Sequence, residues 1–316
     1  MKDEQANTNM FCLNPRYSTT RMVTKDRPTI ENDPSSEVHK KLFLPSHPQR
    51  QGEGGLRTKG YFKRSLPGRP LVSIITVSLN SETKNIEETI KSVISQTYEN
   101  IEYIIIDGGS TDGTLDVIRK YEDKIDYWVS ETDSGIYYGM NKGIGLYNGD
   151  YIYFLNTGDY LFSKSIIEEV VNESISYNQP DLIWGNVITQ NGVKYFGTFG
   201  SKKDFLTKTI SHQAVFSHRR IIEPFDIKYK ISADYDSLLK VFSRDTTSIY
   251  LNNTVAFYDV IKSDKNKKQR LLYNHKRCVE KKLIVKEHYS GLYRILSFLY
   301  FTFNSYRWKF MFWISK

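Results

Sequence analysis

Three apolar runs lie between residues 71 and 159, and the second and third break into loops that carry glycine and carboxylate side chains. The runs are Leu71–Val77, Ile101–Ile106 and Tyr151–Leu155. Nearly continuous apolar residues are typical of strands that are covered on both faces. Between the runs, apolar residues recur at helical spacing, so strands and helices alternate along the chain. This alternation predicts a parallel sheet that is joined by right-handed crossovers.

The same patterns predict further elements on both sides of the third run. Helices are expected at residues 135–147, 163–177, 233–244 and 267–289. Strands are expected at residues 126–130, 182–189, 194–199, 210–216 and 248–260. The chain is long enough to bury one large core, with or without appendages.

Residues 1–69 show no sustained period and are rich in proline, asparagine, serine and charge. We expect an N-terminal extension that is largely irregular and weakly ordered. Within it, Arg50–Phe62 interleaves glycines with arginine and lysine, a pattern that can wrap an anion such as phosphate. A flexible basic linker is the simpler interpretation.

The net charge of +8 comes from the C-terminal tail. Residues 263–316 hold 13 Lys or Arg against 3 Asp or Glu, so the rest of the chain carries about −2. The basic character therefore gives no reason to expect a nucleic-acid partner for the core. The two cysteines, Cys12 and Cys278, form no disulfide framework and no zinc-ligand spacing, which is typical of a reducing compartment. The first 16 residues have no signal-peptide pattern.

Carboxylates follow two of the buried strands at the sheet edge where ligands bind in α/β folds. Asp107 can accept a hydrogen bond from a base N–H, or it can be a turn or helix-capping residue. Asp159 follows Asn156-Thr157-Gly158 and can bind a divalent cation that bridges substrate phosphates, or it too can be a turn residue. The acidic loop 131–135 lies between them in the chain, and three such loops would repel one another unless a cation or donor groups lay among them.

Four segments then carry a resemblance to a known family. They are Ile-Ile-Asp-Gly-Gly-Ser-Thr-Asp-Gly-Thr at 105–114, Ser-Glu-Thr-Asp-Ser-Gly-Ile-Tyr at 130–137, Met-Asn-Lys-Gly-Ile at 140–144 and Gly-Asp-Tyr-Ile-Tyr-Phe-Leu-Asn-Thr-Gly-Asp at 149–159. In this order they resemble family 2 glycosyltransferases over residues 71–260. The resemblance implies the α/β GT-A fold, with a Rossmann-like, mostly parallel sheet and helices on both faces. It also implies a nucleotide-diphosphate-sugar donor, a divalent metal (Mn²⁺ or Mg²⁺) and inversion at the anomeric carbon.

The resemblance assigns roles to individual residues. Asp107 corresponds to the aspartate that pairs with uracil, Asp159 to the metal ligand and Asp234 to the catalytic base. A base at this point takes the proton of the acceptor hydroxyl as that oxygen attacks, although Asp234 can also be a favourable charge at a helix N-terminus. The other residues expected on the nucleotide-sugar side are Val77, Asn80, Gly109, Asp133, Asn156 and Gly158. Those expected on the acceptor or diphosphate side are His212, Gln213 and Trp184, for which a structural histidine and a core aromatic are the alternatives.

The chain departs from the family pattern at three places. Gly108 stands where many relatives have a second aspartate, which weakens the expected nucleotide contacts. Asn156 is not a carboxylate, so the metal would be held by fewer charges. Tyr138-Gly139 stands where similar relatives often have Asp-Ala.

The tail at 263–316 has two interpretations. Its basic helix precedes an aromatic run, and the nine residues 295–303 carry no charge, well short of the ~20 that span a bilayer. Basic and aromatic residues suit a helix that lies in an anionic membrane surface. A helix packed on the catalytic domain with a solvated basic face is equally consistent.

The sequence thus predicts a catalytic domain at 70–262 between the extension and the tail. We expect an inverting transferase that moves a sugar from a UDP-sugar to a lipid-linked saccharide in bacterial surface-polysaccharide synthesis, such as O-antigen, as a cytoplasmic protein on the inner face of the cell membrane. A sugar-phosphate nucleotidyltransferase would need a glycine-rich basic loop after the first strand, but Leu79–Thr83 has neither feature. A dinucleotide-binding enzyme would need Gly-x-Gly-x-x-Gly there. A non-enzymatic basic membrane-binding module leaves the acidic loops unexplained.

Overall fold

The structure is a computed structural model that describes residues 9–30, 32, 34, 37–194, 197–199, 201–206, 209–258 and 267–314. Within these residues, one ten-stranded sheet has the order β3-β6-β5-β4-β7-β11-β9-β12-β8, with β10 paired to β9. Its strands are β3 (Arg50–Gly54), β4 (Val72–Ser78), β5 (Ile101–Asp107), β6 (Tyr127–Glu131), β7 (Tyr151–Phe154), β8 (Tyr160–Leu161), β9 (Leu182–Thr189), β10 (Gly192–Lys194), β11 (Val215–His218) and β12 (Ser248–Phe257). A separate small sheet pairs β1 (Met10–Phe11) with β2 (Val23–Thr24).

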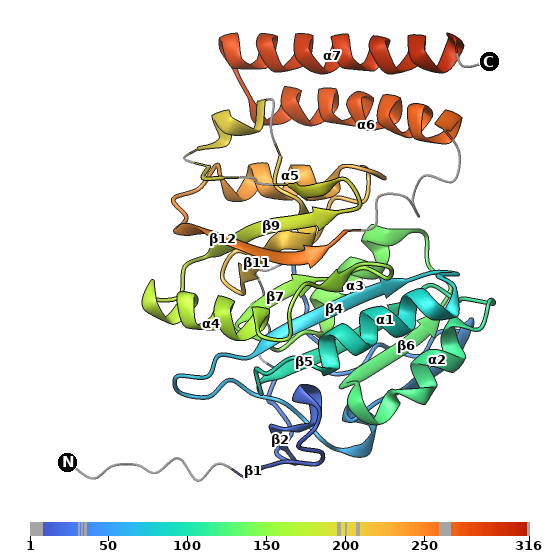
Figure 1. Ribbon diagram of the computed structural model, residues 1–316, viewed down its shortest axis with the longest axis vertical. Coiled ribbons are helices and arrows are strands. Elements are labelled where there is room, and N and C mark those ends of the chain that lie inside the picture. The colour runs from blue at the N-terminus through green and yellow to red at the C-terminus, as the bar shows by residue number, and fades with distance from the viewer. Residues whose placement is uncertain are drawn as a thin grey trace.

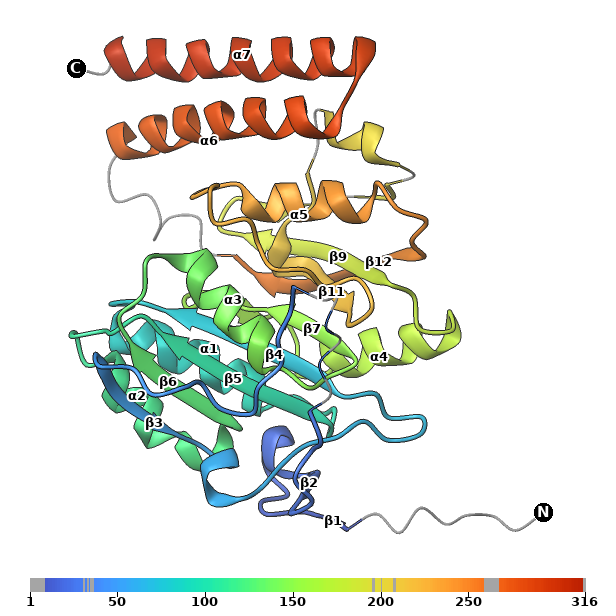
Figure 2. The ribbon, with the colours of Figure 1, turned by 180° about the vertical axis from the view of Figure 1, so that it is seen from behind.

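Helices cover both faces of the large sheet (Figures 1 and 2). They are α1 (Thr83–Ile94), α2 (Thr114–Lys120), α3 (Ile136–Leu146), α4 (Ile166–Ser176), α5 (Ala233–Val241), α6 (Lys267–His288) and α7 (Gly291–Ile314). Short 3₁₀ helices occur at Ser18–Thr20, Arg57–Lys59, Glu122–Lys124, Lys202–Leu206 and His212–Ala214.

The centre of the sheet is parallel and its flanks are mixed. Strands β6, β5, β4 and β7 run parallel, β3 and β11 run antiparallel to their neighbours, and β12 is parallel to β9. The carboxyl ends of β4, β5, β6 and β7 therefore meet at one edge, as the strand–helix alternation predicts. The amino end of β3 lies at the same edge, because Arg50 pairs with Glu131.

Alternate residues of the central strands face two hydrophobic cores. Ile75 of β4 packs in one core with Met140 of α3, and Ile284 of α6 belongs to that same core. Its neighbour Ile74 packs in the other core with Ile90 of α1. The continuous apolar runs are thus explained by a sheet that is covered on both sides.

Two of the predicted strands differ from the structure. Of the described residues in the segment 194–199, Lys194 lies in a strand and residues 197–199 are irregular. In the segment 210–216 the strand begins at Val215, because His212–Ala214 form a short 3₁₀ helix. The predicted end of β12 at residue 260 and the predicted boundary at 262 lie outside the described residues.

Residues 50–63 are packed on the domain through buried side chains, so the expected weak order is wrong for this part. Arg57 of the extension pairs with Glu102 of β5 at 2.5 Å, and both side chains are buried. Two glycines of this segment serve packing: a Cβ on Gly52 or Gly54 would lie 2.9 Å or 2.6 Å from the indole ring of Trp128. Arg50, for its part, is bonded to Glu53 and Glu131, so protein carboxylates take the place of the anion.

The C-terminal helices extend the molecule beyond α5 (Figures 1 and 2). Helix α6 contributes Ile284 and Val285, both fully buried, to the core that it shares with α5. Helix α7 forms the outermost layer, against α6. Packing on the domain is therefore correct for α6, whereas α7 keeps one side exposed.

Candidate active site

A cavity of about 420 Å³ opens at the edge of the sheet where β4 and β7 end. Seven of the residues predicted from the sequence line it: Asn80, Asn156, Gly158, Asp159, His212, Gln213 and Asp234. They come from the loops after β4 and β7, from the turn before β11 and from the first turn of α5. The fold thus brings carboxylates from distant parts of the chain to one space.

Asp234 has a hydrogen-bond partner at each carboxylate oxygen. The Tyr137 hydroxyl donates to Oδ1 at 3.1 Å, and His212 Nδ1 lies 3.4 Å from Oδ2. Burial alone would raise the pKa of Asp234, but the hydrogen bond from His212 and the charge of Lys281 hold this pKa below its usual value. The carboxylate is therefore ionised and can act as a proton acceptor near neutrality.

Asn156 fixes the orientation of the His212 ring. Its side-chain Nδ2 lies 3.0 Å from His212 Nε2 and donates to it, which leaves the ring proton on Nδ1, facing Asp234. The three side chains form a chain of hydrogen bonds from the loop after β7 to the carboxylate of α5. His212 therefore positions Asp234.

The loop after β7 also offers oxygen atoms for a divalent cation. Asp159 is 5% exposed and lines the cavity, and the Oδ1 atom of Asn156 is buried without a partner among the described residues. No group of three or more His, Cys, Asp or Glu that suits a metal occurs within the described part of the chain. One carboxylate and one amide oxygen fit a hard cation that takes its remaining ligands from water and substrate oxygens.

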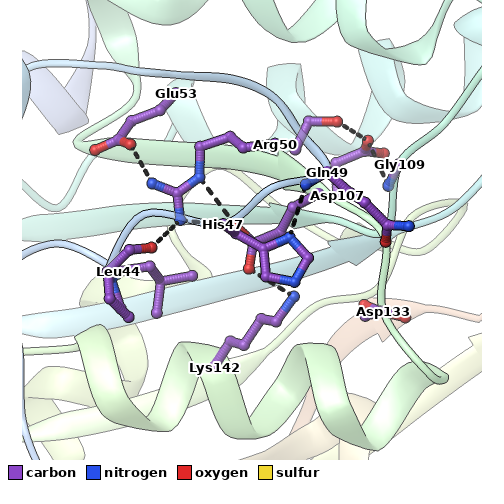
Figure 3. Close-up of polar contacts among 12 residues, drawn as sticks. Leu44, His47, Gln49, Arg50, Glu53, Asp107, Gly109, Asp133 and Lys142 are labelled. Atoms are coloured by element: carbon purple, nitrogen blue, oxygen red, sulfur yellow. Dashed lines mark hydrogen bonds and ion pairs between the residues drawn. The ribbon is translucent and has the colours of Figure 1, made fainter.

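Asp107 does not line the cavity. It is fully buried and accepts hydrogen bonds from the backbone N–H groups of Gly109 and Ser110 and from the hydroxyls of Ser110 and Ser130. Figure 3 shows Asp107 beside Gly109. These donors come from Gly109 and Ser110 of the loop after β5 and from Ser130 of β6, so Asp107 ties the loop to the neighbouring strand. The structure gives Asp107 a positioning role.

Asp133 lies beside the glycine that replaces the second aspartate of the family pattern. Its Oδ1 accepts the Gly135 N–H at 2.9 Å. A Cβ on Gly108 would lie 3.3 Å from its Oδ2. The Asp133 carboxylate therefore lies next to the position that a side chain at residue 108 would occupy.

Gly109 and Asn80 shape the neighbouring loops. Gly109 has a φ of 87°, which favours glycine, and a Cβ there would lie 3.1 Å from the Thr132 hydroxyl. Asn80 ties the loop after β4 to the loop after β5, since its Oδ1 accepts the Thr111 N–H at 2.8 Å.

Two predicted residues lie in the core. Val77 faces α3, where a Cβ on Gly139 would come within 2.6 Å of it, so its side chain sets the distance between β4 and α3. Trp184 is 1% exposed among Phe199, Phe242 and Tyr250, and its indole N–H donates to the Gly197 carbonyl. The expected place for Trp184 in a sugar pocket is therefore wrong.

Several residues at the site were missed from the sequence. Tyr137 was assigned no role, and Tyr273 of α6 lines the cavity. Glu280 of α6 accepts the backbone N–H groups of Lys230, Ile231 and Ser232, directly before α5. Glu280 is one of two glutamates in a basic helix. Helical periodicity does not say which loop such a residue meets.

Known proteins match this chain by sequence. The family model described as "Glycosyl transferase family 2" matches residues 73–242, which is more than half of the chain. The chain belongs to glycosyl transferase family 2. The resemblance of the four segments is thereby confirmed, and this family 2 protein is a glycosyltransferase.

Curated relatives of this family 2 protein are bacterial. A PGL/p-HBAD biosynthesis glycosyltransferase of Mycobacterium bovis is 29% identical over 198 residues, which cover 60% of this chain and 77% of that protein. An uncharacterized glycosyltransferase of Haemophilus influenzae is 38% identical over 105 residues, 32% of each chain.

Two solved structures show the fold. S. aureus TarS 1–349 aligns with a TM-score of 0.54 at 18% identity, covering 74% of this chain and 72% of that one. The mannosyltransferase PcManGT from Pyrobaculum calidifontis, in complex with GDP-Man and Mn²⁺, aligns with a TM-score of 0.53 at 14% identity, covering 75% and 70%. The family 2 protein has the GT-A fold, with C-terminal helices in addition.

Proposed function

We propose that this family 2 protein transfers a sugar from a UDP-sugar to a hydroxyl of a lipid-linked saccharide, with inversion, during bacterial surface-polysaccharide synthesis. The observation that carries the proposal is that Asp159 and Asp234 line one cavity. A crystal structure of S. aureus TarS 1–349 in complex with UDP-GlcNAc, aligned with a TM-score of 0.52, supports the donor class.

Asp234 performs the proton transfer. Its carboxylate accepts the proton of the acceptor hydroxyl while that oxygen attacks C1 of the sugar. The bond between C1 and the diphosphate oxygen breaks, and its electron pair leaves with UDP. Because this is one displacement, a UDP-α-sugar gives a β-linked product. Tyr137 and His212 hold the carboxylate in place throughout.

Asp159 and the Asn156 carbonyl oxygen would hold Mn²⁺ or Mg²⁺. Such an ion neutralises charge on a departing diphosphate. With a single carboxylate on the protein side, we expect weak metal affinity without nucleotide and stronger affinity with it.

The nucleoside lies toward the ends of β5 and β6 in this proposal. Asp133 takes the nucleotide-facing place that the family pattern gives to a second aspartate at position 108. Asp107 holds the loop through which the base would be approached.

The exposed side of α7 contacts the membrane in this proposal. Large apolar side chains that are at least 48% exposed recur along it, namely Leu292, Ile295, Leu296, Leu299, Phe303, Tyr306, Phe310 and Trp313. Arg294, Arg307 and Lys309 on the same helix suit anionic headgroups. Among the described helices, none is both long and apolar enough to cross a bilayer. Helix α7 would thus lie in the surface of the inner leaflet.

Thermal unfolding tests the donor and metal assignments together. UDP with Mn²⁺ should raise the melting temperature more than either alone, and Asp159→Ala should remove the part that depends on the metal. Asp116→Ala, at an exposed position of α2, is the matched control. No shift with any UDP-sugar and Mn²⁺ would contradict the proposal, and protection by UTP with a sugar 1-phosphate instead would favour the nucleotidyltransferase.

A further inference from the structure

A second cavity of about 190 Å³ adjoins the first one at the proposed base. It shares His212, Gln213 and Asp234 with the larger cavity. Its far wall comes from α6, where Arg277 and Lys281 line it. These two residues are four positions apart, so they lie on the same face of the helix.

The cations of this wall have no carboxylate partner of their own within the described residues. The Lys281 ammonium lies over the Tyr235 ring at 3.9 Å and near the Phe301 ring at 5.7 Å. Burial, together with the charge of Arg277, lowers the pKa of Lys281 to about 8, and the charge of Asp234 opposes this. An anion in the cavity would restore the preference of Lys281 for its charged form.

A buried hydroxyl completes the wall. Ser232 is 1% exposed and lines the same cavity, and its Oγ atom has no hydrogen-bond partner among the described residues. Leaving such a group unpaired costs about 1–3 kcal/mol. A ligand oxygen would satisfy it, because a serine hydroxyl donates as readily as it accepts.

We propose that this second cavity binds a phosphate or diphosphate group of the acceptor. An arginine, a lysine and a hydroxyl donor are the groups that recognise phosphate oxygens. The two cations outnumber the one carboxylate, Asp234, at the border of the cavity. This inference rests on the proposed function. The donor is assigned to the larger cavity, which contains Asp159, so the second cavity is left for the acceptor.

The placement also connects the acceptor to the membrane. Helix α6 carries the cations and packs against α7, and Phe301 of α7 lies beside Lys281. An acceptor phosphate bound here would hold the sugar hydroxyl at Asp234 while its lipid continues toward α7.

The test is equilibrium binding of farnesyl diphosphate to the full chain saturated with UDP and Mn²⁺, with farnesol as the neutral probe. We compare wild type, Arg277→Gln, the double variant Arg277→Gln/Lys281→Gln, and the control Lys276→Gln/Lys286→Gln, which removes two exposed charges of the same helix. We expect affinity for farnesyl diphosphate to fall at least tenfold in the double variant and severalfold in Arg277→Gln, and to stay within twofold in the control. Affinity for UDP should stay within twofold in all of them, which also shows that the fold is kept.

Three results would overturn the inference. Unchanged affinity for farnesyl diphosphate would mean that the cations do not bind it. A tenfold loss of UDP affinity instead would assign them to the donor diphosphate. If farnesol bound as tightly as farnesyl diphosphate, the binding would come from the prenyl chain and not from the diphosphate. Failure of UDP to bind wild type would contradict the proposed function instead. Binding of farnesyl diphosphate to the same four proteins without UDP would then still show whether the second cavity binds an anion.

Discussion

Asp234 enters the cavity with a donor at each carboxylate oxygen, and this environment sets its chemistry. The identity of the residue was predicted from the family pattern, whereas its partners were not. Tyr137 and His212 reach it from other elements, and no spacing in the sequence relates them. Asp107 shows the reverse case: its position at the end of a strand was predicted, but its donors were not. Three of them come from Gly109 and Ser110 of its own loop, and the fourth is the Ser130 hydroxyl of β6.

His212→Ala should move the acid limb of the rate–pH profile to higher pH. The pKa of Asp234 is lowered in the folded protein, so its base form is present above that pKa and is lost as the pH falls through it. Without His212, burial is less opposed and the pKa rises. The measurement is kcat/KM against pH below neutrality, with the exposed His39→Ala as control. An acid limb that stays in place in His212→Ala would contradict this role.

At the scale of elements, the strand–helix alternation predicted the central sheet because each buried strand has its own apolar run. Strand β9 has the predicted bounds, Leu182–Thr189. The strand predicted at 210–216 is too long, because the residues directly before Val215 form a 3₁₀ helix that is also partly buried. Helix α6 was predicted, but its contact with the loop before α5 was not, since a basic stripe is also typical of a solvated face.

Glu280→Ala should loosen that loop and destabilise the domain. The Glu280 carboxylate accepts three backbone N–H groups before α5, and charge-assisted hydrogen bonds of this kind contribute about 1.5–3 kcal/mol. Urea unfolding should show a loss of about that size. Glu287→Ala, on the same helix but in an exposed pair with Lys228, should cost less than about 1 kcal/mol. Equal losses for the two variants would be evidence against a capping role for Glu280.

At the scale of the whole molecule, the described N-terminal residues and the C-terminal helices lie at opposite ends of the sheet (Figure 1). No periodic signal marks residues 1–69 in the sequence. The described part of this extension packs through single buried groups instead of a repeated apolar face. The tail has a clear pattern of basic and aromatic residues, but this pattern could not distinguish the packed α6 from the exposed α7.

Arg57→Ala should destabilise the catalytic domain although it lies in the extension. It leaves Glu102 buried without its ion pair, and removing one partner of such a pair costs about 3–5 kcal/mol. Arg69→Ala, whose pair with Glu99 is exposed, should cost less than about 1 kcal/mol. The check is urea unfolding of both variants, and similar midpoints for Arg57→Ala and wild type would show that the extension does not support the domain.

Leu299→Glu with Phe303→Glu should abolish binding to phosphatidylglycerol vesicles. Both side chains are exposed on α7, so the fold should survive, while two charges would enter the apolar surface. Cosedimentation should show at least a tenfold loss of binding with UDP affinity unchanged. Ile175→Glu with Tyr177→Glu, exposed at the end of α4, adds the same charge elsewhere and should bind vesicles as wild type does. Equal losses of vesicle binding in the two double variants would show that the added negative charge, and not the apolar surface of α7, controls binding.

The central claim is that Asp234 is the base for sugar transfer from a UDP-sugar. Its most direct test is the release of UDP from a panel of UDP-sugars with Mn²⁺, by wild type and by Asp234→Asn. We predict release by wild type from at least one donor, and a loss of about 10²–10⁴-fold in Asp234→Asn with UDP affinity within twofold. Normal turnover by Asp234→Asn, or no release from any UDP-sugar by wild type, would contradict it.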